Sequence, residues 1–218
     1  MHIIVAGPTG VGKTTTAGAL STRLRLPACL EEARSNPFLT RFSAEPAKWA
    51  FRSQLWFLLH AMEWHGRSTA SGGVQDHSYY EAWHVFARVQ REFGYLTSED
   101  HQLLGHAAAV GDRILPSPDL VIQLVAPHDV LIERMNRRGR RYERALPPSY
   151  FAALDRRQQA LFDGWTCSPI VTVDASTMDV RSPAGIDALI ERVRLVAPSI
   201  APHDRHVHGH VQRRIERP

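Results

Sequence analysis

Residues 7–14 read Gly-Pro-Thr-Gly-Val-Gly-Lys-Thr and follow directly on an apolar run. This spacing, G-x-x-x-x-G-K-[S/T], is typical of a loop that binds phosphate groups. Its glycines can adopt positive φ, which turns backbone N–H groups inward around phosphate oxygens. Lys13 would place its ammonium at the β- and γ-phosphates, and the Thr14 hydroxyl would join the shell of a Mg²⁺ ion. The pattern predicts a nucleoside triphosphate site for ATP and Mg²⁺, formed by Gly7, Thr9, Gly10, Val11, Gly12, Lys13, Thr14 and Thr15.

A carboxylate follows the second apolar run of the chain. Glu31 ends the expected strand 27–31. Because ligands of open parallel sheets bind beyond the carboxyl ends of the strands, Glu31 would face the cleft of the phosphate loop. There it could take the proton of an attacking hydroxyl as a general base. The alternative is a solvated acid that caps the next helix.

Arginines crowd the segment from residue 134 to residue 141. Like charges at helical spacing repel, so the cluster indicates an anion that meets it. Phosphoryl transfer needs cations around the transferring group, which an arginine-rich lid would supply. A solvated charge run is the alternative. The residues in question are Arg134, Arg137, Arg138, Arg140 and Arg141.

The composition restricts the class of protein. The 218 residues and 44% hydrophobic content suit one packed domain, which we place at residues 1–200. No apolar run approaches membrane-spanning length, and the first six residues leave no room for a signal peptide. The two cysteines indicate a reducing, cytoplasmic setting. The net charge of +4 comes largely from the lid segment and the C-terminal tail, so we expect neither a nucleic-acid nor a membrane partner.

Short apolar runs alternate with amphipathic stretches, which predicts an α/β fold with a parallel sheet and helical crossovers. Residues 201–218 are rich in histidine and arginine, and we expect a flexible tail there, with metal binding as the alternative. The expected strands are 2–6, 27–31, 73–76, 120–125 and 170–173. The expected helices lie near 13–24, 46–64, 79–92, 98–113, 128–137, 148–163 and 183–195.

Further motifs follow in order along the chain. After Glu31 come Asn-Pro-Phe-Leu at 36–39, Glu-Pro-Ala-Lys-Trp-Ala-Phe at 45–51, and Gln54. Asp-His-Ser at 76–78 precedes Tyr80 and Phe86, and Pro-Asp-Leu at 118–120 precedes the lid. At these separations the chain resembles the deoxyribonucleoside kinase family, particularly its bacterial branch. The resemblance implies the three-layer fold of P-loop kinases: a five-stranded parallel sheet, helices on both faces and an arginine-rich lid. It also implies a homodimer.

The resemblance implies a role for each matching residue. Glu31 would be the general base, with Lys13, Arg138 and Arg140 as the other catalytic groups. Arg134 and Arg138 would bind the triphosphate, and Thr14 and Asp76 the metal. Gln54 would bind the base edge, Phe86 would stack on the base, and Glu143 would meet the sugar 3′-hydroxyl. The substrate side would comprise Glu31, Trp49, Gln54, Asp76, His77, Phe86 and Glu143. As alternatives, Phe86 and Trp49 would be core residues, Gln54 a surface glutamine and Asp76 a helix cap.

The chain departs from the family pattern at positions that bear on the acceptor. His77 replaces the arginine of the [D/E]-R-S motif, and it is shorter and only partly charged near neutral pH. Ser43 stands where the family often has a tyrosine. Ala61 and Ala82 stand where purine- and deoxycytidine-type members have an arginine and an aspartate that frame the base. Both positions are apolar here, as they are in thymidine-type members. The acceptor could therefore be a pyrimidine nucleoside, a modified nucleoside or another hydroxyl compound of similar size.

The leading hypothesis is a kinase that transfers the γ-phosphate of ATP to the 5′-hydroxyl of a (deoxy)nucleoside or analogue. A nucleoside monophosphate kinase is the second hypothesis, but its ionised acceptor would need no carboxylate base. A kinase of another hydroxylated small molecule is the third. The non-enzymatic hypothesis is a nucleotide-binding protein without catalysis, which His77 and Ser43 would favour.

Overall fold

Five parallel strands form one sheet in the order β2-β3-β1-β4-β5 in the computed structural model, which describes residues 1–198. The predicted tail 201–218 lies outside the described residues. The strands are β1 (His2–Ala6), β2 (Ala28–Cys29), β3 (Gly73–Asp76), β4 (Leu120–Val125) and β5 (Ile170–Asp174). The predicted five-stranded parallel sheet is therefore confirmed.

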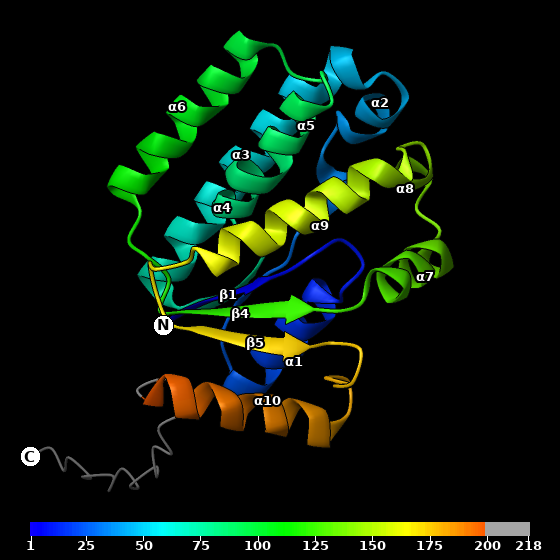
Figure 1. Ribbon diagram of the computed structural model, residues 1–218. Helices are drawn as coiled ribbons and strands as arrows, with labels where there is room; N and C mark the ends of the chain where they lie inside the picture. The colour runs from blue at the N-terminus through cyan, green and yellow to red at the C-terminus, as the bar shows by residue number, and fades with distance from the viewer. Residues whose placement is uncertain (199–218) are drawn as a thin grey trace, which may run out of the picture.

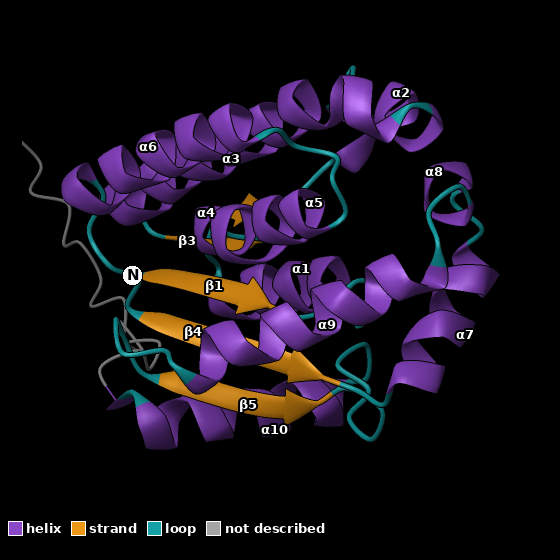
Figure 2. Cartoon of the chain, turned by 45° about the horizontal axis from the view of Figure 1, so that its top comes forward, coloured by secondary structure: helices purple, strands orange, loops and turns teal. Residues whose placement is uncertain are grey.

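Helices cover both faces of the sheet, as Figures 1 and 2 show. One face carries α1 (Lys13–Leu24) and α10 (Pro183–Val196), and the other carries α3, α4, η2, α5 and α9, with α6 packed outside them. Both faces are apolar because the side chains of β1 alternate between two cores: Ile3 and Val5 pack on the α1 side and Ile4 on the α3 side. The remaining bounds are α3 (Pro46–Ser71), α4 (Tyr79–Glu81), η2 (Ala82–Ala87), α5 (Arg88–Glu92), α6 (Ser98–Ile114) and α9 (Pro148–Asp163).

The lid helices α7 (His128–Arg138) and α8 (Arg141–Arg144) lie beyond the carboxyl ends of the strands (Figure 1). The 3₁₀ turn η1 (Ala33–Ser35) and helix α2 (Leu39–Ala44) follow β2. Among residues 1–198, no helix combines the length and the apolar character needed to cross a membrane.

Some predicted bounds differ from the structure. Strand β2 is shorter than the predicted 27–31, since it is an edge strand that pairs only with β3, and β3 ends where His77 adopts a left-handed φ of 68°. Helix α3 runs past the predicted residue 64 and ends before Gly72, whose φ is 81°. The predicted helix 79–92 contains the π-helical stretch η2. The short elements η1, α2 and α8 were not predicted, because so few turns carry little periodicity.

A buried histidine pair lies at the amino end of the sheet. The rings of His2 and His65, at most 1% exposed, are 4.4 Å apart between centroids. The carbonyl oxygen of Pro116 can only accept, so His65 Nε2 donates to it at 2.7 Å. The amide nitrogen of Gln75 donates to two backbone carbonyl oxygens, so the remaining Oε1 accepts a hydrogen bond from His2 Nε2 at 2.9 Å. Burial lowers the pKa of His2 to about 4 and also lowers the pKa of His65.

This pair should make the fold acid-sensitive. Below pH 6.5 the unfolded chain binds protons at His2 that the folded chain takes up only near pH 4, so stability present at pH 7 is lost as the pH falls. We expect His2 to account for a loss of about 2 kcal/mol in unfolding free energy between pH 7 and pH 5. Urea titrations of the wild type and His2→Gln at both pH values measure it. Equal losses in both proteins would contradict the assignment.

Candidate active site

A cavity of about 780 Å³ lies at the carboxyl ends of the strands. The phosphate loop, β3, η2, the lid, α9 and the loop after β5 line it together. It brings most of the predicted site residues into one space, although they are scattered over more than 130 positions of the chain. These are Thr9, Gly10, Val11, Gly12, Lys13, Thr14, Thr15, Glu31, Gln54, Asp76, His77, Phe86, Arg134, Arg138, Arg140 and Glu143.

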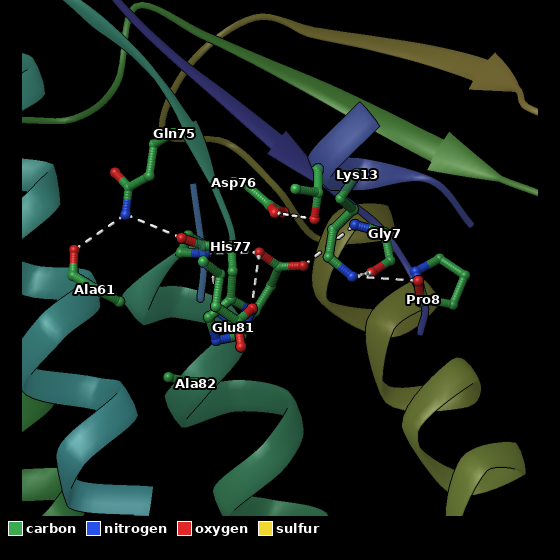
Figure 3. Close-up of polar contacts among 12 residues, drawn as sticks. Gly7, Pro8, Lys13, Ala61, Gln75, Asp76, His77, Glu81 and Ala82 are labelled. Carbon is green, nitrogen blue, oxygen red and sulfur yellow. Dashed lines mark hydrogen bonds and ion pairs between the residues drawn. The ribbon is translucent and has the colours of Figure 1, made fainter. Parts of the chain in front are cut away.

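The phosphate loop has the geometry that its sequence predicts. Gly7 and Gly10 have φ of 145° and 90°, and a Cβ at Gly7 would lie 2.5 Å from the carbonyl oxygen of Leu124. Only glycine therefore fits this close approach. Lys13 Nζ donates to the carbonyl oxygens of Gly7 and Pro8, at 2.7 and 3.2 Å, so the ammonium lies over the loop (Figure 3). The amino terminus of α1 begins here, which favours an anion.

Thr14 and Asp76, the two residues predicted to bind the metal, are in contact. Thr14 Oγ1 donates to Asp76 Oδ2 at 2.5 Å, whereas the buried Asp76 Oδ1 has no partner among residues 1–198. Burial raises the pKa of Asp76, which nearby Glu31 reinforces and Lys13 opposes. No cluster of three or more candidate metal ligands exists in the described part of the chain. Mg²⁺ keeps most of its waters and takes few protein ligands besides substrate phosphates, so this pair fits Mg²⁺.

His77 lies between two carboxylates at the bottom of the cavity. Its Nδ1 is 3.9 Å from Oε2 of Glu31 and 3.9 Å from Oε2 of Glu81. The amide of Gln75 donates to the His77 carbonyl oxygen at 3.0 Å and so supports its left-handed backbone (Figure 3). One imidazole nitrogen faces both acids, where an arginine would offer a bidentate fork.

Glu81 contacts the phosphate loop and lies near His77, although the sequence analysis did not identify it. Its carboxylate is fully buried, and Oε1 accepts from the backbone N–H of Gly7 at 3.2 Å and from Gln158 Nε2 at 2.7 Å. Oε2 accepts from the backbone N–H and the hydroxyl of Ser78. The S-x-x-E spacing is a capping-box signal that could have indicated the bonds to Ser78. Nothing local could have indicated Gly7 or Gln158, which join the phosphate loop and α9 to this carboxylate.

A pair of glutamines also lines the cavity. Gln54 is 2% exposed, so it is not a surface residue; its Nε2 donates to the carbonyl oxygen of Ala82 at 2.7 Å. Gln90, which the sequence analysis also missed, donates to Gln54 Oε1 at 2.8 Å. The ring centroids of Phe86 and His77 are 5.3 Å apart, and Phe86 lines the same cavity. Ala61 and Ala82 are buried, and each presents its backbone carbonyl to a glutamine.

The lid arginines have different partners. Arg134 donates to the carbonyl oxygens of Val11 and Ala175, so it joins the lid to the phosphate loop and to the loop after β5. Arg138 donates to Glu143 Oε1 at 2.5 Å, and Arg140 lies 3.7 Å from the same oxygen. Burial raises the pKa of Glu143, whereas both arginines act to lower it. Arg137 also lines the cavity, and its guanidinium lies 3.8 Å from the exposed carboxylate of Glu133.

Two predicted residues do not line this cavity in the described part of the chain. Gly7 begins the phosphate loop, and its N–H donates to the buried carboxylate of Glu81. Trp49 lies on another face of α3 than Gln54, since five residues correspond to about 140° of helical rotation. Its ring stacks on Phe38 and lies beneath Arg41. The predicted contact of Trp49 with the substrate is therefore not supported by its position.

The sequence matches a known protein family over most of its length. A family model described as Deoxynucleoside kinase matches residues 3–196, which is most of the chain. The chain belongs to the deoxynucleoside kinase family. As a deoxynucleoside kinase it is an ATP-dependent phosphotransferase that phosphorylates deoxynucleosides, which confirms the leading hypothesis of the sequence analysis.

Curated relatives and solved structures agree with this family. The chain is 28% identical over 199 residues to a deoxyadenosine/deoxycytidine kinase of Bacillus subtilis, covering 89% of this chain and 92% of the relative. It is 29% identical over 211 residues to a deoxyguanosine kinase of Lactobacillus acidophilus, covering 89% and 91%. The fold matches a deoxyadenosine kinase from M. mycoides with bound dCTP, with a TM-score of 0.75, 21% identity and coverage of 90% and 100%.

Proposed function

We propose that this deoxynucleoside kinase transfers the γ-phosphate of ATP to the 5′-hydroxyl of a deoxynucleoside, with Glu31 as the general base. The main support is that the Glu31 carboxylate lines the same cavity as Lys13 and Thr14. Its side chain is 22% exposed, so it can give up the proton to solvent after each turnover. His77 Nδ1 lies 3.9 Å from Oε2 of this carboxylate.

The donor side holds the triphosphate and balances its charge. The N–H groups of the phosphate loop and Lys13 bind the phosphates, and Arg138 and Arg140 approach the transferring group from the lid. Arg134 holds the lid base against the loop. Thr14 and Asp76 would hold Mg²⁺, which would neutralise part of the negative charge on the phosphates.

The acceptor side positions the nucleoside. Phe86 provides an aromatic face for the base, and the Gln54 amide lies beside it in the cavity. Glu143 has one oxygen on Arg138 and a second, Oε2, that is buried without a partner among residues 1–198. This oxygen would accept a hydrogen bond from the sugar 3′-hydroxyl. Because the other oxygen of Glu143 binds Arg138, nucleoside binding would then be linked to the position of the lid arginines.

A coupled assay with ATP and Mg²⁺ over deoxyribonucleosides, ribonucleosides and their 5′-monophosphates tests this function. We expect turnover of deoxynucleosides and none of the monophosphates. Turnover of monophosphates alone would favour a nucleoside monophosphate kinase. Binding of ATP without turnover of any acceptor would favour a non-catalytic protein.

We also propose that the enzyme is a cytoplasmic homodimer. Both cysteines, Cys29 and Cys167, are unpaired, as expected in a reducing compartment. Helices α3 and α6 pack together and carry exposed apolar side chains, and the spacing of those on α6 places them on one face. A second copy of this chain would cover them. They are Leu59 on α3 and Leu103, Val110 and Ile114 on α6.

Light scattering should therefore give about twice the chain mass of 24.5 kDa. The double substitution Leu103→Lys and Ile114→Lys should shift the enzyme to monomer, because it buries two charges in the interface. Leu195→Lys on α10, on the other side of the sheet, is the matched control and should stay dimeric. A monomeric wild type, or a variant that stays dimeric, would contradict this interface.

A further inference from the structure

Three buried oxygen atoms around the cavity lack hydrogen-bond partners among residues 1–198. They are Asp76 Oδ1, Gln90 Oε1 and Glu143 Oε2, on side chains that are 1%, 3% and 7% exposed. Each can only accept, and a buried acceptor left unpaired destabilises the protein. A cation or a hydrogen-bond donor of a bound ligand would satisfy each of these atoms. The proposed metal and the sugar hydroxyl account for Asp76 and Glu143, and Gln90 remains unassigned.

The backbone determines which atom of Gln90 is free. The carbonyl oxygen of Ala82 can only accept, so Gln54 must present its amide nitrogen there. The carbonyl oxygen of Gln54 then faces Gln90, which must present its own nitrogen. That nitrogen also lies 3.5 Å from the hydroxyl of Tyr150. Reversing either amide would place two donors or two acceptors together, so the oxygen of Gln90 is the free group.

We propose that Gln90 is a specificity-determining residue whose carbonyl oxygen accepts an N–H from the exocyclic amino group of the base. The second N–H of Gln54, which has no partner among residues 1–198, would donate to the neighbouring ring nitrogen. Adenine and cytosine present this order of donor and acceptor on their edges. Thymine and guanine present an oxo group at the corresponding position, which would face the oxygen of Gln90.

The proposal accounts for base recognition at a site where the side chains of Ala61 and Ala82 are apolar. Two apolar side chains there leave no charge pair to read the base, and the paired amides supply the polarity instead. It rests on the proposed use of the cavity for a nucleoside. Failure of that function would abolish turnover of every nucleoside, whereas failure of this inference would change only the order of preference.

Matched nucleosides test the inference on the wild-type enzyme. Deoxyadenosine, deoxyinosine and purine 2′-deoxyriboside carry an amino group, an oxo group or hydrogen at C6, and deoxycytidine and deoxyuridine form a second pair; their kcat/KM values are compared. The oxo nucleosides also carry a ring N–H that would face Gln54, so purine 2′-deoxyriboside, whose ring nitrogen is an acceptor as in deoxyadenosine, isolates the contact of the amino group with Gln90. We expect a preference of about 10- to 100-fold for amino over oxo, with the hydrogen analogue between them. A preference for oxo, or none, would overturn the proposal.

Gln90→Met removes the carbonyl and keeps the length of the side chain. The amino-to-oxo ratio should fall to about threefold or less, mainly through KM of the amino nucleosides, while the affinity for ATP is unchanged. Tyr150→Phe is the matched control, because it removes another partner of Gln90 and leaves the carbonyl oxygen, so the ratio should persist. If Gln90→Met does not fold, equilibrium binding of the five nucleosides to the wild type gives the same ratios. Retention of the wild-type ratio in Gln90→Met would overturn the assignment.

Discussion

Glu31→Gln should lower kcat by about 10²- to 10⁴-fold and change the affinity for ATP by less than about twofold. The amide keeps the size of the side chain but cannot accept the proton of the 5′-hydroxyl. The loop that binds ATP keeps all its contacts, since none of the hydrogen bonds to Lys13 or Thr14 involves Glu31. Steady-state kinetics with a good deoxynucleoside and calorimetric titration with ATP measure the two quantities.

The neighbouring acid provides the control. Glu32 is exposed and does not line the cavity, so Glu32→Gln changes the net charge equally and should retain wild-type kinetics. A Glu31→Gln enzyme with turnover near that of Glu32→Gln would remove Glu31 from the role of general base. A rise in KM for the nucleoside at unchanged kcat would assign Glu31 to binding alone.

Glu81→Gln should lower the unfolding free energy by about 2–4 kcal/mol, because the substitution leaves buried donors unpaired. The carboxylate of Glu81 accepts four hydrogen bonds, and a glutamine must turn its NH₂ group either to Ser78 or to Gly7 and Gln158. Since Gly7 begins the phosphate loop, the affinity for ATP should also fall, on the order of tenfold. Urea unfolding and calorimetric titration with ATP measure both effects.

Ser78→Ala separates the two consequences. It removes the capping hydroxyl but keeps the bond from Glu81 to Gly7, so it should cost about 1 kcal/mol without weakening ATP binding. If Glu81→Gln is destabilised but binds ATP like Ser78→Ala, Glu81 acts only as a helix cap. Weaker ATP binding in Glu81→Gln alone supports a positioning role at the phosphate loop.

Local patterns predicted much of the site. The phosphate loop is contiguous, and its glycines meet their steric demands within a few residues, so residues 7–14 fold as their spacing indicates. The apolar runs predicted the strands, because both faces of a parallel sheet are covered. Prediction failed where a partner from elsewhere decides the structure. Strand β2 stops where β3 turns at His77.

The sequence by itself therefore determined the donor half of the enzyme: the phosphate loop and the parallel sheet that presents it. Only the tertiary structure decided which buried polar groups meet. Glu81 reaches Gly7 and Gln158 across 74 and 77 positions, and Gln90 meets Gln54 across 36. Such pairs follow no local periodicity, since packing brings their backbones together and each buried donor must then find an acceptor. That requirement fixes the orientation of the two amides in the acceptor half. The carbonyl oxygen of Ala82 accepts from Gln54, and the carbonyl oxygen of Gln54 in turn accepts from Gln90.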